Sequence, residues 1–318
     1  MHIRTLERLR HNHDFAVIYE KGEKRTRQVF VLTAITMTAE VIAGYVFGSM
    51  ALLADGWHMG THAAAFLITI FAYHYTKKHS RDQRFTFGTG KVSVLGGFSS
   101  AIALAFVALI MAIESIQRFI KPSIIQFNEA IFVAVMGLSI NIICAFLLYG
   151  DHEHDHKRDS LHNHHHDHNL RAAYVHVLAD ALTSILAIIA LTFGKYFGWN
   201  WLDSLMGLIG ASLIIWWSYG LLKDTSLILL DRNISLETTR DIIKAIESDS
   251  DNRVADIHVW KIGPADYAAL ISLVTHFPKD SEYYKKLLRK FRELSHVTIE
   301  VNHCDEKSCI ITPDSQIN

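Results

Sequence analysis

The sequence is poor in cysteine and carries almost no net charge, and both shortages narrow the range of functions. Three cysteines among 318 residues are too few for the disulfide framework of a small secreted domain. We therefore expect a reduced, cytosolic setting for Cys304 and Cys309. The formal net charge of −1 argues against a nucleic-acid partner. The first 28 residues contain no apolar stretch, so we expect no cleaved signal peptide.

Hydrophobic residues make up 50% of the chain, and they are unevenly distributed. Residues 1–28 form a polar, charged tail, and residues 29–222 contain nearly all the long apolar runs. Residues 232–305 read as a soluble domain, followed by a tail at 306–318. This composition is typical of an α-helical membrane protein with an appended soluble domain.

Six apolar runs are long enough to cross the roughly 30 Å of hydrocarbon in a bilayer as helices. Lysines and arginines concentrate in the N-terminal tail and in the segments 76–91 and 150–171, on one side of a six-span arrangement. By the positive-inside rule, we expect both termini to be cytoplasmic and the protein to lie in the cell (inner) membrane. The predicted spans are 29–49, 51–75, 92–117, 128–149, 172–197 and 201–222.

The region 232–305 shows the patterns of a helix, two strands, a helix and a final strand, in that order. Ser235 and Ser281 are predicted to cap the two helices. Residues 254–263 alternate apolar and polar side chains as a half-buried strand does, and a turn signal separates them from the strand at 267–277. The order predicts a ferredoxin-like α+β domain.

Two pairs of metal-ligating side chains lie four residues apart inside apolar runs: His58 with His62, and His176 with Asp180. Residues at this spacing share one helix face, so two facing helices would offer three imidazoles and one carboxylate. That set suits a tetrahedral divalent transition metal, and ionisable groups at bilayer depth are usually functional. The alternative is that these side chains only hydrogen-bond helix to helix. Asp55, three residues before His58, is a candidate to orient that imidazole.

Two further groups of residues are candidate metal ligands. The segment 150–170 is a low-complexity histidine-rich loop, for which we predict metal capture, or alternatively a solvated linker. In the soluble domain a second metal site is a hypothesis, although each residue taken singly reads as an ordinary surface or core residue. The loop candidates are His152, His154, His156, His162, His164, His165, His166 and His168, and the domain candidates are His258, His276, His296, Glu300, His303, Cys304 and Cys309.

Over nearly its whole length the chain resembles the cation diffusion facilitators. The motifs that carry the resemblance are GSMALLADGWHM, RFTFGTGK, VHVLADALTS, WLDSLMGLIGASLII and DIHVWKI, together with the six runs and the histidine-rich loop. The resemblance implies a homodimeric metal/proton antiporter that exports divalent cations from the cytoplasm, with its transport site at His58, His62, His176 and Asp180. It implies no organic cofactor.

The chain departs from the zinc-exporting pattern of this family at His62, where those members carry aspartate. The extra imidazole disfavours Mn²⁺ and Mg²⁺ and is similar to the cobalt- and nickel-exporting branch, so we predict Co²⁺ or Ni²⁺, with Zn²⁺ and Cd²⁺ also compatible. Phe85 and Thr89 stand where some members carry histidines for another site, which we do not expect here. A competing hypothesis is a membrane-anchored metal sensor or buffer without transport, and a metalloenzyme is a weaker one.

Overall fold

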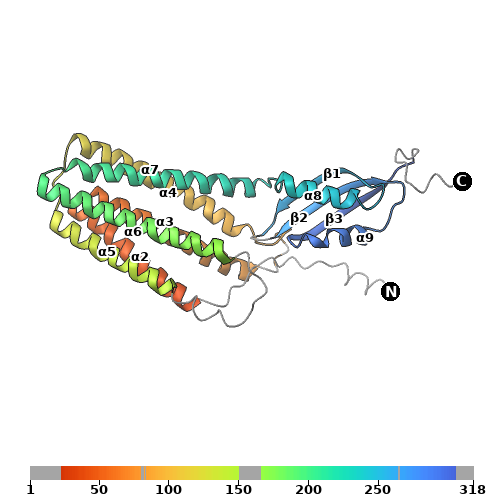
Figure 1. The fold of residues 1–318 in the computed structure, drawn as a ribbon, viewed down its shortest axis with the longest axis horizontal. Coiled ribbons are helices and arrows are strands. Elements are labelled where there is room, and N and C mark those ends of the chain that lie inside the picture. The colour runs from red at the N-terminus through yellow and green to blue at the C-terminus, as the bar shows by residue number, and fades with distance from the viewer. Residues whose placement is uncertain (1–22, 80–81, 83, 150–165, 264–265, 306–318) are drawn as a thin grey trace. The chain divides into compact units, whose positions relative to one another are not determined.

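The computed structural model describes residues 23–79, 82, 84–149, 166–263 and 266–305 (Figure 1). Along some helices it describes the backbone but not every side chain, and those of His62, His176 and Asp180 are among the ones left out. The chain divides into two compact units. We call residues 18–71 and 96–223 the helical unit. We call residues 72–95 and the chain from residue 224 onward the C-terminal unit.

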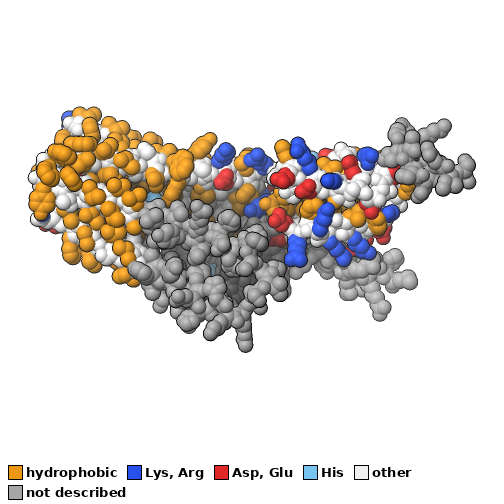
Figure 2. All heavy atoms as spheres, in the orientation of Figure 1, with side chains coloured by type: hydrophobic (Ala, Val, Ile, Leu, Met, Phe, Trp, Pro, Cys, Tyr) orange, Lys and Arg blue, Asp and Glu red, His pale blue; other side chains and the backbone are white. Residues whose placement is uncertain are grey.

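Among the described residues, six long helices cover the six apolar runs of the sequence, which confirms helix formation there, while the crossing of a membrane by all six stays a prediction. Three of them, α4, α5 and α7, have apolar stretches long enough to cross a membrane, and shorter apolar segments lie at 31–47 and 181–197. Figure 2 shows hydrophobic side chains over most of the visible surface of the helical unit. The chain is therefore a helical membrane protein. The helices are α2 (Glu23–Phe47), α3 (Met50–His79), α4 (Val92–Ile120), α5 (Phe127–Tyr149), α6 (His166–Phe197) and α7 (Trp201–Leu229).

A two-residue turn joins α2 to α3. Gly48 adopts a positive φ of 73°, which glycine reaches without steric cost. The amide of Ser49 donates to the carbonyl of Gly44 over 3.0 Å, which is the longer hydrogen bond of a Schellman helix end. A Cβ on Gly44 would lie 2.7 Å from Leu53 Cγ, so this glycine lets α2 and α3 approach closely.

Helix α3 contributes to two hydrophobic cores among the described residues of the helical unit. On one side Leu53 and Ala54 pack with Ala108 of α4 and Ile214 of α7. On the other side Leu52 packs with core residues of α2, α5 and α6. The first half of α3 is therefore packed between other helices, and its polar residues Asp55 and His58 are buried there.

In its described residues from 224 onward, the C-terminal unit contains a three-stranded sheet with two helices and a 3₁₀ turn. The strand order is β1-β2-β3, with β1 and β2 antiparallel and β2 and β3 parallel. Residues from all three strands, α8, α9 and η1 form one core that includes Ile271 and Tyr284. The elements are α8 (Leu236–Glu247), β1 (Arg253–Lys261), β2 (Tyr267–Thr275), α9 (Ser281–Leu287), η1 (Leu288–Lys290) and β3 (Leu294–His303).

The predicted order of elements in this domain is confirmed, with two differences. Ser235 caps α8 as predicted, but α9 is capped by Asp280 rather than Ser281. The Asp280 side chain accepts from the amide of Tyr283, and Ser281 is already the first helical residue. The helix is also shorter than predicted, because η1 follows Leu287 directly. The described residues form three strands, whereas a full ferredoxin-like order has four. An isolated bridge pairs Asn233 with Trp260 ahead of α8.

Candidate functional site

His58 lies in the interior of the helical unit, about two turns after the buried start of α3. Only 3% of its surface is exposed. Its ring centroid lies 5.0 Å from that of Trp217 on α7, with the planes at 45°. Its carbonyl accepts a hydrogen bond from Thr61 Oγ1. An imidazole held against an indole inside a helical bundle has little rotational freedom, as a metal ligand requires.

Asp55, one turn before His58, ties α3 to α6. It is 3% exposed, and its Oδ1 accepts a hydrogen bond of 3.0 Å from Thr183 Oγ1. Thr183 lies three residues after Asp180, and Asp55 lies three residues before His58. The contact between the two helices is therefore within one turn of a predicted ligand on each helix. Figure 1 shows α3 and α6 within the same helical unit.

The directions of α3 and α6 follow from two contacts. Leu52 of α3 and Leu191 of α6 belong to the same buried cluster. Three residues further along α3, Asp55 contacts Thr183, which lies eight residues earlier on α6. Moving forward along α3 therefore means moving backward along α6, and the two helices are antiparallel here.

The remaining predicted ligands of the membrane site are placed by their backbones alone. His62 is in α3, and His176 and Asp180 are in α6; their side chains lie outside the described part of the structure. In the histidine-rich loop, His166 and His168 form the first turn of α6. The other six loop histidines, at 152, 154, 156, 162, 164 and 165, lie outside the described residues. The convergence of the four ligands therefore stays a prediction.

Asp203 has a role that sequence reasoning missed. From α7 it accepts hydrogen bonds from Ser49 Oγ (2.7 Å), the Met50 amide (2.7 Å) and the Ala51 amide (3.0 Å). It is 2% exposed. The carboxylate thus caps the N-terminus of α3, where free amides and the helix dipole favour negative charge. In the sequence Asp203 reads only as a polar residue within an apolar run.

Arg118 of α4 stabilises the same turn. Its guanidinium donates to the Gly48 carbonyl over 2.6 Å and to Glu114 Oε1 over 2.5 Å. The start of the ligand-bearing helix α3 is therefore fixed from two neighbouring helices, one supplying an anion and the other a cation.

In the C-terminal unit, the seven candidate ligands fall in different places. Thr275 pairs with His303 across β2 and β3, and the Cys304 amide donates to the Thr275 carbonyl. This brings His276, His303 and Cys304 to one end of the sheet. His258 and Glu300 are exposed on β1 and β3, and His296 lies 5.5 Å from the Phe87 ring. Cys309 lies outside the described residues.

His276 has the environment of an oriented ligand. Its Nδ1 lies 2.6 Å from Asp251 Oδ2, and its amide donates to the same oxygen over 3.1 Å. Thr275 Oγ1 donates to Asp251 Oδ1 over 2.6 Å. Burial by itself would raise the pKa of Asp251, but the hydrogen bonds from Thr275 and His276 outweigh it and lower that pKa. The ionised carboxylate thereby fixes the imidazole.

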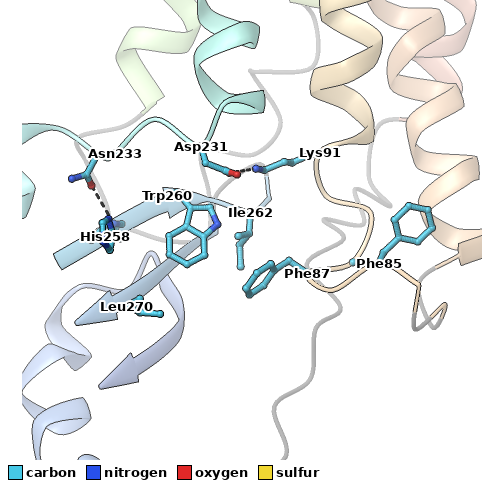
Figure 3. A pocket seen from close by; sticks show the side chains of 11 residues that line it. Phe85, Phe87, Lys91, Asp231, Asn233, His258, Trp260, Ile262 and Leu270 are labelled. Atoms are coloured by element: carbon cyan, nitrogen blue, oxygen red, sulfur yellow. Dashed lines mark hydrogen bonds and ion pairs between the residues drawn. The ribbon is translucent and has the colours of Figure 1, made fainter. Parts of the chain in front are cut away.

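His258 lines a cavity of about 660 Å³ in the C-terminal unit (Figure 3). Phe87 and Trp260 form much of its wall, with ring centroids 5.8 Å apart. Lys91 and Asp231 form an ion pair at its edge. The Nε2 of His258 itself lies 2.9 Å from Asp256 Oδ2. The mostly apolar lining does not resemble a metal site.

Within the described residues, no group of three or more histidine, cysteine, aspartate or glutamate side chains is placed to hold a metal ion. The side chains of three of the four predicted membrane ligands, and all of Cys309, lie outside the described part of the structure. The transport site therefore stays a prediction, whereas the described candidates of the C-terminal unit do not form a metal-binding group.

Comparisons with known proteins identify the family. Residues 28–230 match the model of the cation efflux transmembrane domain. The chain belongs to the cation efflux family. The zinc transporter ZitB of Yersinia pestis is 30% identical over 317 residues, covering 94% of this chain and 92% of its own. The cadmium, cobalt and zinc/H(+)-K(+) antiporter of Bacillus subtilis is 27% identical, covering 92% and 91%. The zinc transporter ttm-1 of Caenorhabditis elegans is 28% identical, covering 91% and 74%.

Membership in the cation efflux family confirms the resemblance drawn from the sequence motifs and makes this chain a transporter rather than an enzyme. The matched region includes all six long helices except the first residues of α2, and thus includes His58, Asp55 and Asp203. The buried polar residues of the helical unit are therefore part of a transport domain.

Proposed function

We propose that the protein exports divalent transition-metal cations from the cytoplasm in exchange for protons. The observation that carries this proposal is the buried contact between α3 and α6, where Asp55 accepts a hydrogen bond from Thr183 beside the buried His58. The contact supports a metal site between α3 and α6, because the predicted pairs, His58 with His62 and His176 with Asp180, begin within one turn of it.

The register of the two helices supports the four-ligand assignment. A helix rises about 1.5 Å per residue, so His58 lies about 4.5 Å beyond Asp55, and Asp180 about 4.5 Å before Thr183. Because the helices are antiparallel, these displacements run in the same direction. By the same reasoning His62 is level with His176. This register supports the proposal that His58 and Asp180, and one turn further His62 and His176, contribute to a single metal site.

The identity of the metal depends on His62. Three imidazoles and one carboxylate suit Co²⁺, Ni²⁺, Zn²⁺ and Cd²⁺ better than oxygen-preferring cations. The named relatives transport zinc, or cadmium, cobalt and zinc. We propose that this chain accepts Zn²⁺, Cd²⁺ and Co²⁺, as they do. The predicted preference for Co²⁺ or Ni²⁺ rests on His62 alone.

Protons exchange with the metal because imidazole ligates only in its neutral form. Its unperturbed pKa of about 6.5 lets modest changes in local charge switch its state. With the site open to the cytoplasm, the arriving cation displaces protons from the ligands. When the site opens outward, protonation releases the metal and the protonated ligands return. The termini are cytoplasmic in this scheme, in keeping with the lysines and arginines of the cytoplasmic segments.

The C-terminal unit is proposed to bind metal and to join two copies of the chain. His276, His303 and Cys304 share one end of the sheet, but the described side chains do not form a metal-binding group there, so this part of the proposal rests on the residue types alone. The histidine-rich loop would capture metal at the cytoplasmic face. A sensor or buffer without transport is the competing function, and it would bind metal without moving it.

Flux into proteoliposomes tests the proposal. A metal-sensitive dye and a pH dye are enclosed, and the lumen is made more acidic than the outside. Zn²⁺, Co²⁺ or Ni²⁺ is then added outside. Asp180→Ala is expected to abolish flux, and His62→Asp to shift selectivity toward Zn²⁺. His74→Ala removes an exposed histidine of the same helix and is expected to leave flux unchanged. Binding without flux in the unaltered protein would favour a buffer and overturn the proposal.

A further inference from the structure

The middle of α2 carries a carboxyl group that the proposed transport site does not use. Glu40 has no exposed surface. Within the described part of the chain, neither of its carboxyl oxygens has a hydrogen-bond partner. A buried carboxylate without donors is costly, and ionisable groups inside membrane helices usually serve a function. Glu40 therefore needs an explanation other than packing.

Two glycines make room for this carboxyl group. A Cβ on Gly137 of α5 would lie 1.8 Å from Glu40 Oε1. A Cβ on Gly56 of α3 would lie 3.1 Å from Glu40 Cβ. The carboxyl group thus lies between α2, α3 and α5, in a space that exists because both neighbouring positions lack a side chain.

The charges around Glu40 come mainly from α3. Asp55, next to Gly56, interacts electrostatically with Glu40, and His58 follows it by one turn. Among the described side chains of α5 and α6, the charged ones are Glu129 and Lys195, and both are exposed near helix ends. Among the described side chains of these helices, the electrostatic influence on Glu40 therefore comes from a carboxylate and not from a cation.

Asp55 and Glu40 differ in the donors that reach them. Asp55 accepts a hydrogen bond from Thr183, which stabilises its ionised form. Glu40 has no such donor among the described residues, and two neighbouring carboxylates in an apolar interior do not both ionise without a cation. The proton of the pair therefore belongs on Glu40 while the site is empty.

We propose that Glu40 is a proton-binding site of the exchange, separate from the four predicted ligands. Its carboxyl group holds a proton while the transport site is empty. A divalent cation arriving one turn from Asp55 supplies positive charge, and Glu40 then releases its proton to water on the side to which the site is open. When the metal leaves, Glu40 takes up a proton again. This inference rests on the proposed metal transport and adds one proton carrier to it.

Proton release on Zn²⁺ binding tests the inference. The full-length protein in detergent is titrated with Zn²⁺, and released protons are counted by calorimetry in buffers of different ionisation enthalpy. Glu40→Gln keeps the shape of the side chain but cannot hold the proton. We expect it to release about one proton fewer per Zn²⁺ than the unaltered protein, with a correspondingly weaker dependence of zinc affinity on pH.

Three variants separate this role from a structural one. Glu129→Gln makes the same change at an exposed carboxyl group of α5 and is expected to release the original number of protons. Glu40→Asp keeps a titratable group and is expected to restore the lost proton. If Glu40→Gln does not fold, Glu40→Met carries the same test, because its unbranched apolar side chain suits this interior.

The outcomes distinguish the two proposals. If the unaltered protein neither binds nor transports Zn²⁺ or Co²⁺, the proposed function fails. If it transports metal, and folded Glu40→Gln or Glu40→Met releases as many protons per Zn²⁺ as the unaltered protein, the inference about Glu40 is overturned while metal transport stands.

Discussion

The helical unit and the C-terminal unit bury carboxyl groups in contrasting ways. In the C-terminal unit, Asp251 accepts from Thr275 Oγ1 and from the amide and ring of His276. In the helical unit, Asp203 is similarly supplied with three donors, whereas the described residues give Glu40 none. Carboxylates with a full set of donors hold local structure together. Glu40, which has no described hydrogen-bond donor and lies in the transport domain, is available to change its protonation state.

The largest effect on stability is expected from Asp203→Ala. The change leaves the Ser49 hydroxyl and the amides of Met50 and Ala51 buried without their acceptor. Each unsatisfied donor costs about 1–3 kcal/mol, so we expect the helical unit to lose about 3 kcal/mol or more. Thermal unfolding in detergent measures this loss. Glu129→Ala, at an exposed acid, is the control, and equal melting temperatures for both variants would contradict the role of Asp203 as a cap.

A somewhat smaller loss is expected from Asp251→Ala in the C-terminal unit. The hydroxyl of Thr275 and the amide and ring of His276 lose their acceptor, and we expect a cost of about 2–3 kcal/mol. Asp256→Ala is the control, because Asp256 is exposed and its described ion pair is with His258, which is also exposed. Denaturant unfolding of the full chain, followed by signals from the C-terminal unit, makes the comparison. Equal unfolding midpoints for the two variants would show that the hydrogen bonds of Asp251 with Thr275 and His276 do not contribute to stability.

The difference in stability between the unaltered protein and Asp251→Ala is expected to depend on pH. The folded pKa of Asp251 is lowered relative to its unfolded value of about 3.9. Its stabilising contribution is therefore complete above the unfolded pKa and is lost as the pH falls through the folded pKa. The difference in stability between the unaltered protein and Asp251→Ala should stay constant near neutral pH and shrink below about pH 4.

A moderate effect is expected from Gly137→Ala, which places a methyl group against Glu40. The Cβ would lie 1.8 Å from Glu40 Oε1, so the side chain or the helices must move, at a cost of about 1–3 kcal/mol. Gly220→Ala in α7 meets nothing within 4 Å and should instead gain up to about 1 kcal/mol from helix propensity. Thermal unfolding of the two variants tests whether their changes in stability have opposite signs. A stabilised Gly137→Ala would disprove the close contact between Gly137 and Glu40.

The smallest effect is expected from Lys91→Ala, at the edge of the cavity in the C-terminal unit. Lys91 pairs with Asp231, but their side chains remain 30% and 56% exposed. An ion pair of this kind contributes below about 1 kcal/mol and is screened by salt. Unfolding measured at low and high salt should show the difference disappearing. A loss as large as that of Asp251→Ala would mean that exposed and buried ionic contacts do not differ here.

Much of the architecture could be predicted because the relevant patterns are local. The apolar runs gave the six helices, and alternation in 254–263 and 267–277 gave β1 and β2. Ser235 was recognised as a cap from its position before an amphipathic segment. Ser281 was chosen over Asp280 wrongly, since two adjacent residues can both cap and only the backbone geometry decides between them.

The polar contacts between helices could not be predicted in the same way. Asp203 and Ser49 are 154 residues apart, and Asp55 and Thr183 are 128 apart. Nothing in the local sequence of α7 indicates which helix terminus its aspartate will meet. The sequence likewise presented Glu40 as one polar residue among several in the apolar runs.

By itself, the sequence determined the spacing of the predicted ligands, because the helical repeat places residues four apart on one face wherever the helix lies. It also determined membership in the cation efflux family. Only the tertiary structure decided that α3 and α6 run antiparallel with Asp55 against Thr183, that Asp203 caps α3, and that no described donor reaches Glu40. These are outcomes of packing between distant segments, and backbone hydrogen bonding within one helix does not specify them.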